Sequence, residues 1–150
     1  MSHHHHAGAS GSLNSIAFSA TVHCLTGCAI GEVLGMVLGT ALAWSNLVTI
    51  VASVLLAFLF GYGLTMMPLL RSGMAFQSAA GVALSTDTAS IATMEIVDNA
   101  FMLIVPGAMT AGLTSALFWI SLAVSLLLAG AAAFPVNRWL IARGYRGACH

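Results

Sequence analysis

Residues 23–40, HCLTGCAIGEVLGMVLGT, combine an imidazole, two thiols and a carboxylate with a glycine at every fourth position. On a helix the side chains of Cys24, Cys28 and Glu32 lie on one face, because residues four apart are neighbours. Thiolate and imidazole ligands at this spacing suit soft or borderline metals such as Cu(I) and Zn(II). The segment therefore predicts a metal site, with His23 at the edge of the face. The alternative is that both cysteines pack as small apolar side chains.

A second set of reactive side chains lies in residues 76–102, a segment rich in Ser, Thr and Ala. At about 100° per residue, Asp87, Met94 and Asp98 share one narrow stripe of a helix, with Glu95 at its edge. Such a stripe cannot face lipid, so it must line a bundle interior, an oligomer interface or a water-filled path. The alternative is that this helix is longer than the bilayer requires, and that Glu95 and Asp98 project into water.

The two segments are expected to run in the same direction, so heights along them can be compared at about 1.5 Å per residue. We predict a ladder of metal ligands, in which outer carboxylates attract a cation and thiols receive it at mid-depth. From the outside inward, the expected order is Asp98 and Glu95 with flanking Met94 and Met102, then Glu32, then Asp87 with Cys28 and Cys24, and finally His23. The predicted cofactor is a metal ion, either copper or zinc.

Four glycines, Gly27, Gly31, Gly35 and Gly39, form a row on the first of these helices. Three overlapping GxxxG repeats favour close helix packing, because glycine lets two backbones approach. We expect that contact to bury the thiols and the carboxylate of the same helix away from lipid. The stripe of residues 87–98 is predicted to lie opposite them, with a cation between.

The elements that must position these groups are membrane helices. Of the 150 residues, 59% are hydrophobic and only 5% are charged, far below the roughly one-quarter charged share of soluble domains. Four segments are long enough to cross a bilayer, which needs about 20 apolar residues: 15–42, 46–67, 74–105 and 113–134. We predict an all-α polytopic membrane protein with four transmembrane helices, in contact with the lipid bilayer. The short connections make sequential helices antiparallel neighbours.

One membrane domain accounts for most of the chain. We assign residues 1–14 to a flexible His-rich N-terminal tail, 15–137 to the four-helix transmembrane domain and 138–150 to a short Arg-containing cytoplasmic tail. The N-terminal run of histidines is consistent with either a native tract or a purification tag.

The arginines set the expected orientation. Arg71 follows the second span, and Arg138, Arg143 and Arg146 follow the fourth, so all four lie on one side. The positive-inside rule makes that side cytoplasmic. We predict a multi-pass protein of the inner (cytoplasmic) membrane with both termini inside, assembled as a homo-oligomer because four spans enclose little space. The chain has no lysine and no polybasic face for nucleic acid.

Three stretches, HCLTGCAIGE, MEIVDN and the Arg-rich tail, resemble a bacterial family of small four-helix membrane proteins catalogued only as a domain of unknown function. The resemblance covers nearly all of the chain. It implies the four-span fold and carries over no activity, cofactor or site residue, so the function must be argued from the residues themselves.

These residues favour a metal-ion-binding membrane protein that acts as a soft-cation permease or relay of the copper type. One alternative is a proton or hard-cation pathway that uses the carboxylates, with the cysteines as packing. Another is a non-transporting accessory subunit of a larger membrane complex. An enzyme is not expected, because the spans contain one histidine, no Glu-x-x-His pair and no nucleophile motif.

Overall fold

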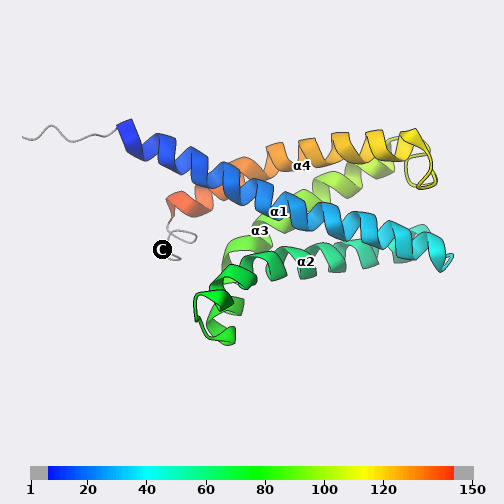
Figure 1. Cartoon of the computed structure of the whole chain (residues 1–150). Helices are drawn as coiled ribbons and strands as arrows, with labels where there is room; N and C mark the ends of the chain where they lie inside the picture. The colour runs from blue at the N-terminus through cyan, green and yellow to red at the C-terminus, as the bar shows by residue number, and fades with distance from the viewer. Residues whose placement is uncertain (1–6, 144–150) are drawn as a thin grey trace, which may run out of the picture.

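The computed structural model describes the backbone of residues 7–143 and the side chains of residues 13–143. Within this range the chain is all α, as predicted. The helices are α1 (Ala7–Ala41), α2 (Asn46–Arg71), α3 (Phe76–Ile104) and α4 (Ala116–Ala142) (Figure 1). The N-terminal run of histidines and Arg146 lie outside the described residues.

The helices follow the predicted spans, with an extension at the start of α1 and another at the end of α4. α1 begins at Ala7, before the predicted start of the first span, and α4 continues to Ala142, so that it includes Arg138. Two serines define where the second and fourth helices start. The hydroxyl oxygen of Ser45 accepts a hydrogen bond from a backbone N–H in the first turn of α2, and Ser115 does the same for α4. Such caps satisfy amides that have no partner inside the helix.

Three helical segments, Leu13–Ala41, Asn46–Arg71 and Ala116–Ala142, are long and apolar enough to cross a membrane. The chain is therefore a helical membrane protein. At 29 residues α3 is also long enough, but its polar stripe makes it less apolar than the other three helices. Length and composition thus support three of the four predicted spans.

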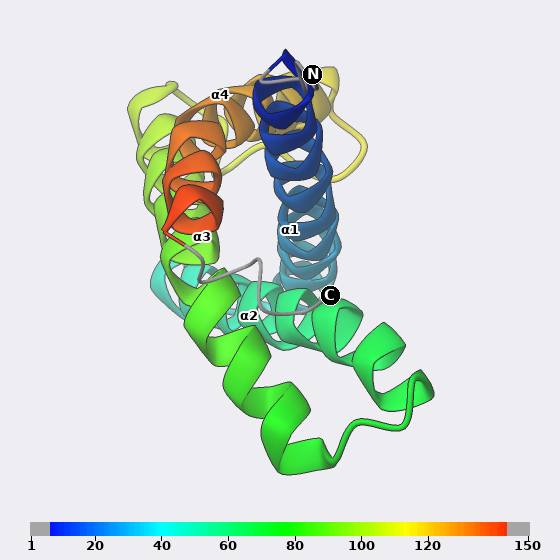
Figure 2. The same cartoon turned by 90° about the vertical axis from the view of Figure 1, so that its left-hand side faces the viewer.

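The helices pack as two antiparallel pairs, α1 with α2 and α3 with α4, whose contacts are the most extensive. α1 also packs on α4, and α2 on α3, whereas α1 and α3 meet over only a short stretch. At the end that carries Arg71, the turn between α2 and α3 swings away from α1 and α4 (Figure 1). Figure 2 shows the α2–α3 hairpin parting from α1 and α4 at this end. We call this opening the fork.

The glycine row of α1 lies directly against α2. The facing pairs are Gly27 with Gly61, Gly31 with Ala57, Gly35 with Ser53, and Gly39 with Thr49. A Cβ atom added to any of the four glycines would overlap with atoms of α2. The facing residues of α2 are themselves small, buried and spaced by four. Two rows of small residues therefore bring the α1 and α2 backbones into close contact.

A third row of small residues lies on α4 and faces the interior. It consists of Ser121, Ser125, Ala129 and Ala133, all of which are buried. One turn further along α4, the amide nitrogen of Asn137 donates a hydrogen bond of 2.9 Å to the hydroxyl of Thr21 on α1. This bond joins α1 and α4, which lie on the opposite side of the fork from the α2–α3 turn.

Candidate functional site

All four acidic residues of the chain are buried. The exposed fraction of the side chain is 3% for Glu32, 1% for Asp87, 5% for Glu95 and 2% for Asp98. Of the described basic side chains, Arg71 lies in the last turn of α2, Arg138 in the C-terminal part of α4 and Arg143 at its C-cap. A buried charge is costly unless it is paired, hydrogen bonded or neutralised. The interior of the bundle is therefore where the chemistry of this chain is concentrated.

Glu32 from α1 and Glu95 and Asp98 from α3 form one group, which we call the acid cluster. The three carboxylates are close enough for the charges of Glu95 and Asp98 to act on Glu32. Their helix positions explain this: Glu32 is nine residues before the end of α1, and Glu95 is nine residues before the end of α3. Because α1 and α3 run in the same direction, the three carboxylates lie at a similar height.

Hydrogen bonds from neighbouring side chains hold the acid cluster. The hydroxyl of Ser125 on α4 donates to Oδ1 of Asp98. The amide nitrogen of Asn99 donates to Oε2 of Glu95 over 3.4 Å. The second carboxylate oxygens, Oε2 of Glu32 and Oδ2 of Asp98, are buried and have no hydrogen-bond partner within the described residues. The cluster therefore combines fixed partners with oxygens that can still accept or carry a proton.

Asp87 lies further toward the fork and has its own surroundings. The hydroxyl of Thr86 donates to Oδ1 of Asp87 over 3.1 Å, and the Cys24 thiol lies 4.0 Å from the same oxygen. Asp87 also lines a cavity inside the fork together with His23. The buried Nε2 of His23 has no hydrogen-bond partner within the described residues.

Two sulfur atoms lie between Asp87 and the acid cluster. The thiol of Cys28 is 3.8 Å from the thioether sulfur of Met94, and both side chains are buried. The same thiol is within hydrogen-bonding reach of Glu95. Polar and polarisable groups thus follow one another along the α1–α3 boundary, from His23 at the fork to the acid cluster.

The structure brings the predicted site residues to one boundary but divides them among three places. His23, Cys24 and Asp87 are near the fork, Cys28 and Met94 follow, and Glu32, Glu95 and Asp98 form the acid cluster. Among residues 13–143, no three His, Cys, Asp or Glu side chains are arranged so that they could hold a metal ion. The copper or zinc site therefore stays a prediction.

Some residues that support the site were not singled out from the sequence as partners of the carboxylates. These residues are Ser125, Asn99 and Thr86. A small polar residue at the centre of an apolar helix, as Ser125 is in α4, signals a hydrogen-bonding partner on another helix. The α2 row from Thr49 to Gly61 was also missed, although its spacing of four is visible in the sequence.

A family model described as a domain of unknown function, DUF4396, matches residues 14–146. The chain belongs to the DUF4396 family. The resemblance to a domain of unknown function is thereby confirmed, and the DUF4396 match extends through all four helices and includes every candidate site residue. Comparisons with curated proteins and with solved structures give no significant match. Function in this DUF4396 chain therefore has to be argued from its own geometry.

Proposed function

We propose that this membrane protein carries protons through its buried carboxylates. The observation that carries the proposal is the acid cluster, in which buried Glu32 of α1 lies within electrostatic range of buried Glu95 and Asp98 of α3. Chains of intramembrane carboxylates serve as proton relays in pumps and transporters. A proton held among three neighbouring carboxylates relieves their mutual repulsion, and it can pass from one oxygen to the next.

The surroundings of the acid cluster favour protons over ion pairing with a basic side chain. Within the sequence, no lysine or arginine occurs between Arg71 and Arg138, and none precedes Arg71. Glu95 and Asn99 also line a cavity of about 340 Å³ between α2 and α3, whose other walls are apolar. Glu95 of the cluster therefore reaches the groove between α2 and α3.

The proposal includes four spans, with both termini in the cytoplasm and the inner membrane as the location. The outward side of α3 supports its role as a span, because Leu84, Ile96 and Leu103 are each more than half exposed. α3 thus presents apolar side chains outward and carboxylates inward. A helix with a polar stripe needs this orientation in a membrane, because the stripe must face the interior of the bundle. The arginines at one end of the bundle support the orientation. Assembly as a homo-oligomer, or within a larger complex, stays a prediction.

A soft-cation pathway of the copper type is the second candidate, and a specific contact favours it. The thiol of Cys28 is 3.8 Å from the thioether of Met94, and Cys24 belongs to the same buried cluster. Thiol and thioether ligands select Cu(I). Copper bound stoichiometrically to protein without its N-terminal histidines, and lost in Cys24→Ser and Cys28→Ser, would support this candidate. Metal-free protein would contradict it.

Proton flux into liposomes tests the main proposal. Purified protein is reconstituted with a trapped pH indicator, and valinomycin with a potassium gradient supplies the driving force. Asp98→Asn keeps the shape of the side chain but removes its titratable oxygen, so we expect the initial flux to fall at least tenfold. Gly81→Ala on α3 is the control, because nothing lies within 4 Å of the added methyl group.

Two results would overturn the proposal. One is a wild-type flux no greater than that of empty liposomes. The other is an Asp98→Asn flux equal to that of the wild type when both proteins elute as the same monodisperse species in detergent.

A further inference from the structure

The C-terminal end of α4 carries two arginines, and each of them is held by a neighbouring side chain. Nε of Arg138 donates a hydrogen bond of 2.7 Å to Oδ1 of Asn14 on α1. The guanidinium carbon of Arg143 lies 5.0 Å from the centre of the Trp139 ring, which is a cation–π contact. We call Asn14, Arg138, Trp139 and Arg143 the arginine patch. Both contacts restrict long side chains, so the two positive charges are held at this end of the bundle.

No acidic side chain of the chain lies at the surface beside the arginine patch. All four acidic residues are buried in the interior and are at most 5% exposed, whereas Arg138 and Arg143 are exposed. The bond to Asn14 uses one N–H donor of Arg138, and a guanidinium carries several more. The patch therefore presents positive charge and N–H donors to a partner from outside the chain, and that partner must be an anion.

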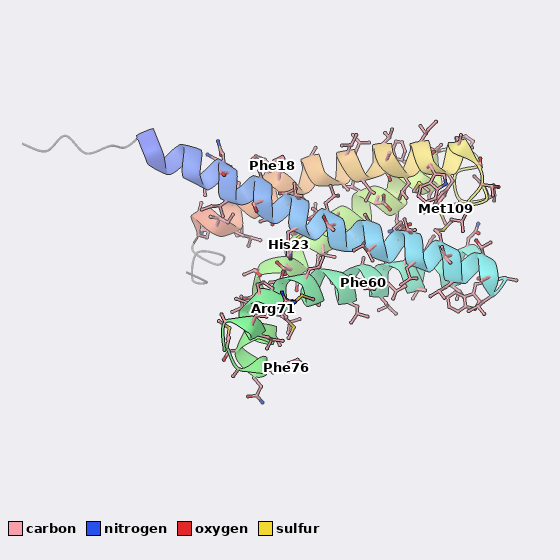
Figure 3. The ribbon with its side chains drawn as sticks, viewed as in Figure 1. Phe18, His23, Phe60, Arg71, Phe76 and Met109 are labelled. Atoms are coloured by element: carbon pink, nitrogen blue, oxygen red, sulfur yellow. The ribbon has the colours of Figure 1, made fainter. Side chains whose placement is uncertain are left out.

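The surroundings of the patch indicate the kind of anion. The side chain of Trp139 is 53% exposed, and an exposed tryptophan at the end of a span lies at the level of the lipid headgroups. One turn along α1 from Asn14, Phe18 is 64% exposed, and Figure 3 shows it on α1. Arginine binds phosphate oxygens through paired N–H donors. Phosphate donors next to an exposed apolar surface are the complement of a phospholipid.

We propose that the arginine patch binds an anionic phospholipid. The lipid phosphate accepts hydrogen bonds from Arg138, Arg143 adds a second positive charge nearby, and an acyl chain lies along α1 past Phe18. A headgroup with a net negative charge is preferred to phosphatidylcholine, whose choline would bring a further positive charge to the arginines. This site goes beyond the proposed proton pathway, because lipid binding here requires no proton transfer through the acid cluster.

Native mass spectrometry of the purified full chain tests the site, because protein released from detergent micelles retains tightly bound lipids. Phosphatidylglycerol and phosphatidylcholine with the same acyl chains are added in equal amounts. We expect the first bound lipid of the wild type to be phosphatidylglycerol, at least tenfold more often than phosphatidylcholine. Arg138→Gln keeps a long polar side chain but removes the charge, and it should lower that preference at least threefold.

A matched control separates a lipid site from general attraction to a positive surface. Arg71→Gln removes the same charge at the same end of the bundle, but Arg71 lies at the turn of the α2–α3 hairpin, across the fork from α4 (Figure 3). Its preference for phosphatidylglycerol should stay within twofold of the wild type. Arg143→Gln, at an exposed position, covers the case in which Arg138→Gln does not fold, and it should also lower the preference at least threefold.

Three results would overturn the proposal. They are equal binding of the two lipids by the wild type, equal losses of preference in Arg71→Gln and in the patch variants, and displacement of the bound lipid by millimolar inorganic phosphate, which would show that any small anion suffices. Each of them leaves the liposome flux test unaffected, so failure here is distinguishable from failure of the proton pathway.

Discussion

Two neighbouring faces of α1 make contrasting contacts. The face that meets α2 consists of glycines, and the two backbones come so close that no Cβ atom fits between them. The face that meets α3 carries Cys24, Cys28 and Glu32, and the contacts there are made by side-chain atoms 3.8 to 4.0 Å apart. One helix thus combines a tight, nearly side-chain-free interface with a polar one.

The difference shows how a small bundle can hold polar groups in its interior. Close approach of backbones stabilises a helix pair through packing contacts alone and needs no polar side chain. Where larger side chains keep α1 and α3 further apart, carboxylates and thiols have room and can meet partners. The α1–α2 contact therefore serves as the scaffold, and the α1–α3 boundary carries the chemistry.

The largest effect is expected from a side chain placed in the scaffold. Gly31→Val puts a branched side chain against the backbone of Ala57 and should destabilise the fold by about 3 kcal/mol, as overpacking does. The measurement is the thermal unfolding of purified protein in detergent. Gly63→Ala on α2 is the matched control, because nothing lies within 4 Å of its added methyl group, and it should change stability by less than about 1 kcal/mol. Equal effects of the two variants would contradict a tight α1–α2 contact.

On the polar face, a conservative change should affect function more than stability. Glu32→Gln keeps the shape of the side chain, so we expect the protein to unfold within a few degrees of the wild type. Proton flux should fall at least tenfold, which corresponds to about 1.4 kcal/mol, because the amide cannot accept and release a proton. Unchanged flux in folded Glu32→Gln would remove Glu32 from the pathway.

A smaller effect is expected where α4 supports the acid cluster. Ser125→Ala removes the hydroxyl that donates to Asp98, and loss of one such bond should cost about 1 kcal/mol in stability. Thermal unfolding in the Asp98→Ala background checks the assignment, since most of the cost should disappear when position 98 has no side-chain acceptor. A cost that persists in full would assign the effect of Ser125 to packing.

The smallest effect is expected for a hydroxyl on the scaffold side. Ser53 faces Gly35, and its buried Oγ has no hydrogen-bond partner within the described residues. Ser53→Ala should therefore change the stability by less than about 0.5 kcal/mol, because no hydrogen bond is lost. A loss of stability as large as that of Ser125→Ala would contradict the difference between the α1–α2 scaffold and the hydrogen-bonded acid cluster.

The sequence allowed the helices and much of the scaffold to be predicted. Hydropathy placed all four helices in the right segments, because it acts locally along the chain. The start of α1 and the end of α4 were each missed by eight residues, and α2 and α4 continue through Pro68 and Pro135. The glycine row from Gly27 to Gly39 could also be recognised from the sequence, because a spacing of four is a local pattern. Its partner row on α2 was harder to recognise, because Thr49, Ser53, Ala57 and Gly61 alternate with large apolar residues that face outward.

The arrangement of the site could be predicted only in part. Helical periodicity placed Asp87, Met94 and Asp98 on one stripe, and all three side chains are buried. Which helix supplies their partners depends on tertiary packing, so the bond between Ser125 and Asp98 could not be derived from spacing. The fork was also beyond sequence reasoning, because short connections predict antiparallel neighbours but not the angle at which the α2–α3 hairpin parts from α1 and α4.

The uneven distribution of carboxylates has a consequence for biogenesis. On the four-span arrangement proposed above, α3 carries three of the four acids and is the helix that would partition least readily into lipid by itself. Ser125, which donates a hydrogen bond to Asp98 of α3, lies on α4, and α4 is synthesised last. On that arrangement we expect integration of α3 to depend on α4, with the two helices entering the bilayer as a hairpin beside an α1–α2 pair that is already in place.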